Sequence, residues 1–251
     1  MAIVAPGVVE AREVPRPVPG PGQVRVRVEG CGVCASNLGP WAGLPWLRYP
    51  LAPGLGGHEA WGTVEEAGDG ADALLGARVA VLGDAGWAEH VLADAATAVV
   101  LPEALDDVPF PGEAFGCAAN VFARSRVSRG DTVAIVGIGF LGASLCRLAS
   151  DAGATVIAVS RRDSSLALAR DHGAAHAVRM DDHARVIGEV RAITRERMCE
   201  RTIEAVGLQW PLDLASELTA ERGTLVIAGY HQDGPRQFQL WTFTWRGPSW
   251  W

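Results

Sequence analysis

The sequence predicts an α/β protein with two domains, a β-rich domain over residues 1–119 and a doubly wound parallel sheet over residues 120–251. Three observations predict this fold class. The chain of 251 residues is long enough for two modest cores. The first half is rich in Gly, Pro and Val and carries short alternating segments. The second half alternates apolar runs with segments of helical spacing.

Short strands between glycine turns characterise the first domain. Residues 23–30, QVRVRVEG, alternate apolar and polar side chains, which is typical of a half-buried strand. Residues 61–68, 77–83 and 87–94 predict further short strands. The domain is therefore expected to be a small antiparallel β structure with long connections.

The second domain repeats a strand-then-helix order. The predicted strands are 131–139, 154–160, 201–207 and 223–230, and the predicted helices are 140–153, 163–174 and 211–223. Strands that alternate with helices indicate a parallel sheet covered on both faces.

Composition excludes several classes of partner. The net charge of −7 argues against nucleic acid or an anionic membrane as the main partner. No apolar run reaches the ~18–20 residues that span a bilayer, and the N-terminus lacks a signal-type segment, so a cytoplasmic location is the default expectation. All 22 basic residues are Arg, so backbone amides and Arg must hold any bound phosphate.

A dinucleotide motif lies where the second domain begins. Gly137, Gly139 and Gly142 form G-x-G-x-x-G, and Phe140 and Leu141 stand inside it. The motif follows a predicted strand and opens a predicted helix, which makes it far more specific than the glycines alone. The glycines permit a tight turn, a close approach to a pyrophosphate and close helix packing. The alternative is a glycine turn without a ligand.

The end of the second strand of this unit favours NADP over NAD. An acidic residue at this position binds the ribose 2′-hydroxyl of NAD. Here the strand ends in Ser160, Arg161 and Arg162, which can donate hydrogen bonds to a 2′-phosphate. The alternative is that both Arg side chains are solvated surface residues, with NAD as the cofactor.

A zinc site is predicted from Cys34, His58 and Cys117, with Glu59 as a transient fourth ligand or a supporting carboxylate. Two thiolates and an imidazole suit Zn²⁺, and three protein ligands leave one position open for catalysis. Cys and His residues this far apart are also common as structural residues, so both interpretations stay open. The other cysteines are expected to be buried apolar residues (Cys31, Cys146, Cys199). The other histidines are expected at the surface or in packing, among them His90, His172, His176 and His231.

Three segments in order resemble the medium-chain dehydrogenase/reductase superfamily, in its zinc alcohol dehydrogenase-like branch. They are GCGVCASN (30–37), GGHEAWGTV (56–64) and the segment from GEAFGCAANVF to VGIGFLG (112–142). The resemblance spans nearly the whole chain. It implies a GroES-like catalytic domain followed by a Rossmann domain, with the active site in the cleft between them.

The resemblance also implies roles for individual residues. Cys34, His58 and Cys117 would bind zinc, and Ser36 would hydrogen-bond the substrate oxygen and pass its proton outward. A hydride would then move between an alcohol and NAD(P). The expected substrate is a small secondary alcohol, polyol or cyclitol, or the corresponding carbonyl compound.

The chain departs from the family pattern at several points. Asn37 and Gly39 replace the usual Asp and a frequent relay His, and no four-Cys cluster follows His58. Family members also continue further, so the sheet is expected to lack its last strand, with poor solubility or an altered homo-oligomer as the result.

Three alternatives follow from these departures and from the Trp residues. The first is an impaired or inactive remnant that still binds a nucleotide or a partner. The second is a zinc-free quinone or enoyl reductase, against which the Cys and His ligands speak. The third is an electron-transfer or interaction module, suggested only by the nine Trp residues. Trp41 and Trp46, which follow the Cys34 segment, are expected either to line the substrate pocket or to pack in the core.

Overall fold

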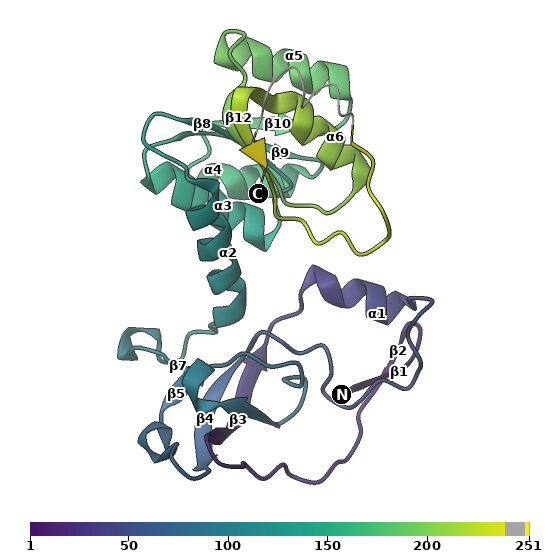
Figure 1. Cartoon of the computed structure of the whole chain (residues 1–251), viewed down its shortest axis with the longest axis vertical. Helices are drawn as coiled ribbons and strands as arrows, with labels where there is room; N and C mark the ends of the chain where they lie inside the picture. Colours follow the sequence, from purple (N-terminus) through teal and green to yellow (C-terminus); the bar gives the residue numbers. More distant parts are fainter. Residues whose placement is uncertain (239–248, 251) are drawn as a thin grey trace. The chain divides into compact units, whose positions relative to one another are not determined.

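The computed structural model describes residues 1–238 and 249–250. The chain divides into two compact units, residues 1–114 and residues 115–251 (Figure 1). This division lies five residues before the expected boundary at 119/120. It falls inside helix α2 (Gly112–Ser125). Residues 239–248 and 251 of the tail lie outside the described residues.

Two antiparallel sheets form the first unit. Strands β1 (Ala2–Ala5) and β2 (Val8–Glu10) make a hairpin. Five strands form the larger sheet in the order β6-β3-β4-β5-β7: β3 (Gln23–Cys31), β4 (Ala60–Ala67), β5 (Arg78–Ala80), β6 (His90–Asp94) and β7 (Val99–Val100). The four strands predicted from alternation are all present in this sheet. Its core consists of small side chains such as Val24, Val26, Val64 and Val79.

Short helical segments fill the connections of the first unit. The 3₁₀ turn η1 (Ala35–Asn37) runs directly into α1 (Leu38–Ala42). The remaining turns are η2 (Asp72–Leu74), η3 (Ala95–Thr97) and η4 (Glu103–Leu105). The long link between β3 and β4 therefore carries η1 and α1, and it ends in the glycine-rich segment before β4.

The second unit contains a parallel sheet in the order β10-β9-β8-β11-β12-β13. Its strands are β8 (Thr132–Val136), β9 (Thr155–Ser160), β10 (His176–Arg179), β11 (Cys199–Glu204), β12 (Thr219–Ile227) and β13 (Ser249–Trp250). Its helices, besides α2, are α3 (Phe140–Asp151), α4 (Asp163–Asp171), α5 (His183–Thr194) and α6 (Gln209–Leu218). Elements β10 and α5 were not anticipated from the sequence.

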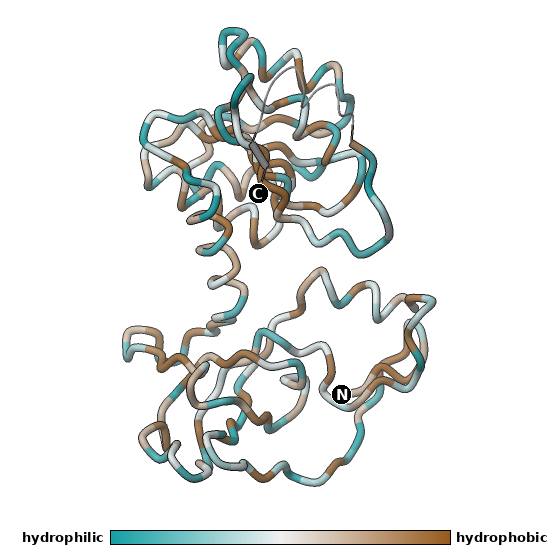
Figure 2. The backbone as a smooth tube through the Cα atoms, viewed as in Figure 1, coloured by the Kyte–Doolittle hydropathy of each residue, from teal (hydrophilic) through white to brown (hydrophobic). Residues whose placement is uncertain are grey.

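Alternate residues of the central strand face two separate cores. Ala134 and Val136 of β8 pack with α5 and α6, whereas Val133 and Ile135 pack with α3 and α4. Figure 2 shows apolar segments through the interior of this unit and hydrophilic residues along its outer helices. The sheet is therefore covered on both faces, which confirms the doubly wound prediction.

The last strand of the parallel sheet, which the sequence predicts to be missing, is present but very short. Five strands have between four and nine residues, but β13 contributes only Ser249 and Trp250, paired in parallel with Thr224 and Leu225 of β12. The sixth position of the sheet is thus held by two residues. The prediction of a missing strand is corrected to a two-residue strand among the described residues.

The sequence pattern predicts the junction between α6 and β12 later in the chain than the structure shows it. The helix ends at Leu218 rather than 223, and Thr219 already pairs with Cys199 of β11. A bulge separates this pair from the next one, Arg201 with Thr224. Sheet pairing across a bulge overrides the helical preference of the Ala-Glu-Arg segment, because local propensity is weak against tertiary pairing.

No helix within the described part of the chain is long and apolar enough to cross a membrane.

Candidate functional site

Three predicted ligands meet in the first unit. One ligand atom each from Cys34, His58 and Glu59 lies within 4.8 Å of the other two. Cys34 precedes η1, and His58 and Glu59 directly precede β4. The β3–β4 link therefore returns on itself and brings residues 24 positions apart in sequence to one place.

Glu59 is the most constrained member of this group. Its side chain is buried, and burial raises its pKa. The nearby Glu113 carboxylate raises this pKa further, while His58 and a hydrogen bond from the Cys34 thiol lower it. A Cβ at Gly32 would lie 1.7 Å from Glu59 Oε2, so only glycine leaves room for this carboxylate. The Gly32 amide also donates to the Glu59 carbonyl at 3.1 Å.

Asn37 ties the Cys34 turn to the His58 segment. Its Oδ1 accepts a 2.8 Å hydrogen bond from the Cys34 amide, and its Nδ2 donates to the Gly56 carbonyl at 2.9 Å. The side chain is buried at 6 % exposure. A carboxylate could accept the first bond but could not donate the second. Asn37 therefore provides a link that the usual Asp of this position could not.

Ser36 and Cys117 are the remaining predicted members of the catalytic set. Ser36 is half-buried within η1, two residues after Cys34. Cys117 is exposed on α2 and belongs to the second unit, four residues after Glu113 and on the same helical face. Their roles stay predictions.

The other cysteines differ in their surroundings. Cys146 and Cys199 are fully buried, and burial raises the pKa of each thiol to about 12. Cys31 is only partly buried, and burial beside the Glu59 carboxylate raises its pKa. Cys31 thus packs against the core of the five-stranded sheet from a partly buried position beside Glu59.

The glycine motif has the geometry that its spacing predicts. Gly137 has φ +104°, and a Cβ there would meet Val206 at 2.4 Å. A Cβ at Gly142 would lie 2.0 Å from the Gly137 carbonyl oxygen, so α3 packs directly on the turn. Gly139 precedes α3, and a Cβ there would have no neighbour within 4 Å. The space beside Gly139, directly before α3, is therefore open, as the approach of a pyrophosphate to this turn requires.

The two residues inside the motif have different neighbours. Phe140 is the first residue of α3, about half exposed, and its ring packs edge-on against Phe115 with centroids 5.0 Å apart. Leu141 is partly buried against the core shared by α3 and α4. Direct cofactor contact by either residue stays a prediction.

The predicted ribose-binding residues stand at the carboxyl end of β9. Ser160 is buried as the last strand residue, and Arg161 and Arg162 are exposed. Arg161 lines a cavity of about 220 Å³ formed at the carboxyl ends of neighbouring strands. The other residues that line it are Met180, Asp181, Val206, Leu208, Trp210 and Pro211. In open α/β sheets, ligands bind at this edge.

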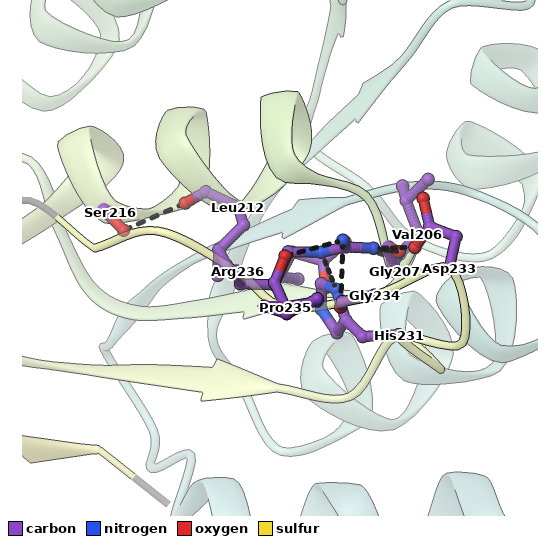
Figure 3. A network of polar contacts seen from close by, with 10 residues as sticks. Val206, Gly207, Leu212, Ser216, His231, Asp233, Gly234, Pro235 and Arg236 are labelled. Atoms are coloured by element: carbon purple, nitrogen blue, oxygen red, sulfur yellow. Dashed lines mark hydrogen bonds and ion pairs between the residues drawn. The ribbon is translucent and has the colours of Figure 1, made fainter.

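One polar network was missed in the sequence. The fully buried Glu204 carboxylate ends β11 and accepts bonds from the Val206 and Gly207 amides at 2.7 and 2.8 Å. His231 contacts the same carboxylate at 3.1 Å. Arg236 donates a 2.6 Å hydrogen bond to His231 (Figure 3). His231 had been assigned to the surface or to packing. The available signal was a Glu at the end of an apolar strand, which demands buried partners.

Two family models match the chain. An alcohol dehydrogenase GroES-like domain covers residues 20–103, and a zinc-binding dehydrogenase domain covers residues 137–249. The chain belongs to the zinc-binding branch of the medium-chain dehydrogenase/reductase superfamily. This membership accounts for the order of the three segments 30–37, 56–64 and 112–142 along the chain.

Individual dehydrogenases agree with this family. An alcohol dehydrogenase of Geobacillus stearothermophilus is 31% identical over 217 residues, 72% of this chain and 63% of that protein. A zinc-binding dehydrogenase from Sinorhizobium meliloti 1021, solved with NADP, has 27% identity and a TM-score of 0.83, covering 99% of this chain and 82% of that chain. A short chain alcohol dehydrogenase from Escherichia coli CFT073, complexed with NADH, has 26% identity and a TM-score of 0.86, covering 99% and 81%.

The match is partial in length. The chain spans 58–63% of the length of the first three curated relatives that it matches.

Proposed function

We propose that this medium-chain dehydrogenase is an NAD(P)-dependent zinc enzyme that interconverts a small alcohol and its carbonyl compound. The observation that carries the proposal is the meeting of Cys34, His58 and Glu59 within 4.8 Å. Sulfur, imidazole nitrogen and carboxylate oxygen are the donors that zinc takes at about 2.0–2.3 Å, so ligands of one ion lie roughly 3–4 Å apart. Small side-chain rotations would bring the three atoms to that separation.

The predicted catalytic residues would have two roles, metal binding and proton transfer. Cys34, His58 and Cys117 would hold the zinc, and Glu59 would serve as a transient fourth ligand or as a supporting carboxylate. Bound zinc polarises the substrate oxygen and lowers the pKa of an alcohol. Ser36, two residues from Cys34, would accept the hydroxyl proton and pass it to water, because Gly39 offers no side chain for a relay.

The glycine turn would hold the dinucleotide. The open space beside Gly139 supports pyrophosphate binding at the start of α3, and NAD(P) held there would supply the hydride chemistry. Arg161 at the 220 Å³ cavity supports NADP as the preferred form. The Asp181 carboxylate in the same cavity is bonded to Arg185, which lowers its pKa and offsets its charge against a 2′-phosphate.

The substrate class is proposed from the family pattern as a secondary alcohol, polyol or cyclitol. No polar side chain of the described residues selects among these three.

Zinc content and turnover test the proposal together. The purified chain is expected to hold about one zinc per chain, measured by elemental analysis, and to reduce NADP with a panel of secondary alcohols and polyols. Cys34→Ser and His58→Ala are expected to lose both zinc and activity, because each removes a ligand. Cys31→Ala is the matched control and is expected to keep both.

Two outcomes would contradict the proposal. Equal loss in Cys31→Ala and Cys34→Ser would mean that the thiols act through folding rather than as a ligand. One zinc per chain without turnover on any alcohol would favour the inactive remnant.

A further inference from the structure

The segment after β12 is fixed to the turn that follows β11. We call residues 229–237 the strap. The Gly229 amide donates to the Glu204 carbonyl at 2.9 Å. At the other end of the strap, Gln209 Nε2 donates to the Gln237 carbonyl at 2.8 Å, and Gln209 Oε1 accepts from the Gln237 amide at 2.9 Å. The strap is thus fixed at one end to the last residue of β11 and at the other to the first residue of α6.

Glycines allow the strap to approach this closely. A Cβ at Gly207 would lie 2.6 Å from the Tyr230 carbonyl oxygen, and a Cβ at Gly229 would lie 2.2 Å from the Gly207 amide and 2.6 Å from Glu204 Oε2. Any larger residue at either position would separate the strap from the turn.

A chain of three side chains then fixes the peptide at Gly207 from both sides. Glu204 accepts from the Gly207 amide, and Arg236 donates to the Gly207 carbonyl at 2.7 Å. His231 is hydrogen-bonded to Glu204 Oε2. It also accepts a hydrogen bond from Arg236 Nε (Figure 3). Asp233 also pairs with Arg236.

The hydrogen bonds assign the state of His231. Arg236 can only donate, so Nδ1 of His231 must accept and carries no proton. The proton of the neutral ring is then on Nε2, which donates to Glu204. His231 therefore acts as a bridge with one donor and one acceptor, joining a buried carboxylate to a guanidinium.

The turn held in this way forms part of a cavity wall. Val206 and Leu208, on either side of Gly207, both line the cavity that contains Arg161. A Cβ at Gly137 of the glycine motif would also touch Val206. We propose that Glu204, His231 and Arg236 are positioning residues that hold the Val206–Gly207–Leu208 wall in the shape that receives the dinucleotide. This inference rests on the proposed dinucleotide binding, but it makes a separate claim about the wall.

His231→Ala and His231→Gln test the bridge. Alanine removes both hydrogen bonds, whereas a Gln amide offers one donor and one acceptor and can restore both. His176→Ala, at an exposed position on β10, is the matched control. Amide hydrogen exchange of Val206 and Gly207 is measured in the ligand-free full chain. NADPH affinity is measured by calorimetry well below each unfolding temperature.

His231→Ala is expected to speed exchange at Val206 and Gly207 and to weaken NADPH binding about tenfold, because a buried charged hydrogen bond is lost. His231→Gln is expected to restore both, and His176→Ala to change neither. If His231→Ala does not fold, Arg236→Met removes the hydrogen bond to His231 Nδ1 and leaves the bond between His231 and Glu204. This variant is likewise expected to speed exchange at Val206 and Gly207 and to weaken NADPH binding.

Unchanged exchange at Val206 and Gly207 in the Ala variant would overturn the inference. So would a Gln variant that behaves like the Ala variant, or faster exchange with unaltered NADPH affinity. If the unmodified chain binds no NADPH while exchange responds as expected, the proposed function fails and the hold on the wall stands.

Discussion

At the scale of single residues, Asn37 shows how one side chain can join two parts of the proposed zinc site. It accepts from the Cys34 amide and donates to the Gly56 carbonyl, two residues before His58. Partners of this kind orient ligands, and their loss commonly weakens metal binding by 10–100-fold.

Asn37→Asp is therefore expected to lower zinc affinity about tenfold. The new carboxylate oxygen would face the Gly56 carbonyl without a proton to donate. Competition with a chromogenic chelator measures the affinity. Asn120→Asp is the matched control, because exposed Asn120 only accepts from Arg124 and an Asp keeps that bond. An Asn37→Asp chain that holds zinc as tightly as the unmodified chain would refute this role.

The proposed preference for NADP also rests on a single residue, Arg161. It is exposed at the carboxyl end of β9 and lines the cavity beside Val206. Arg161→Ala is expected to weaken NADP binding at least tenfold and NAD binding by less than twofold, because only NADP offers a phosphate to the guanidinium. Titration with both cofactors measures this, with exposed Arg170→Ala as the control. Equal weakening of NAD and NADP would contradict the preference.

At the scale of elements, two glycines of the turn between β8 and α3 have different roles, one in packing and one in the proposed binding of the dinucleotide. A Cβ added at Gly142 would overlap the Gly137 carbonyl oxygen, whereas a Cβ added at Gly139 would lie in open space. The same added methyl group therefore has a different consequence at each position.

Gly142→Ala is expected to destabilise the chain by about 1–3 kcal/mol, because its Cβ would overlap the turn. Gly139→Ala is expected to keep the melting temperature and to weaken NADPH binding at least tenfold, because the methyl group occupies the space of the pyrophosphate. Calorimetric melting and titration measure the two effects. A Gly139→Ala chain with unaltered affinity would mean that the turn does not hold the dinucleotide.

At the scale of the whole molecule, exposed apolar surface is the main feature. The first unit contains a cavity of about 1240 Å³ lined by side chains such as Val9, Val14, Val33 and Trp41, each of which is more than a third exposed. An exposed apolar groove of this kind favours association between molecules.

The chain is accordingly expected to self-associate with rising concentration. Light scattering coupled to size exclusion measures the mass, which should exceed the 26.5 kDa of one chain. A mild non-ionic detergent should shift it back toward 26.5 kDa, because detergent covers the apolar groove. A monodisperse species of 26.5 kDa at high concentration would be inconsistent with this expectation.

The sequence by itself determined the elements whose signal is local. The period of apolar residues placed β3, β8, β9, α3 and α4 within a few residues of their observed bounds, and the glycine spacing placed the dinucleotide turn. These features depend on neighbours a few positions away along the chain. The identity of Cys34, His58 and Glu59 as candidate ligands was also readable, because few residue types bind zinc.

Only the tertiary structure decided what depends on distant partners. It brought Cys34 to His58, gave Asn37 its two hydrogen bonds and moved the start of β12 to Thr219. It also joined Glu204 to His231 and Arg236 across 27 and 32 positions of sequence. Buried polar groups must find partners wherever the fold supplies them, and no periodicity records that choice.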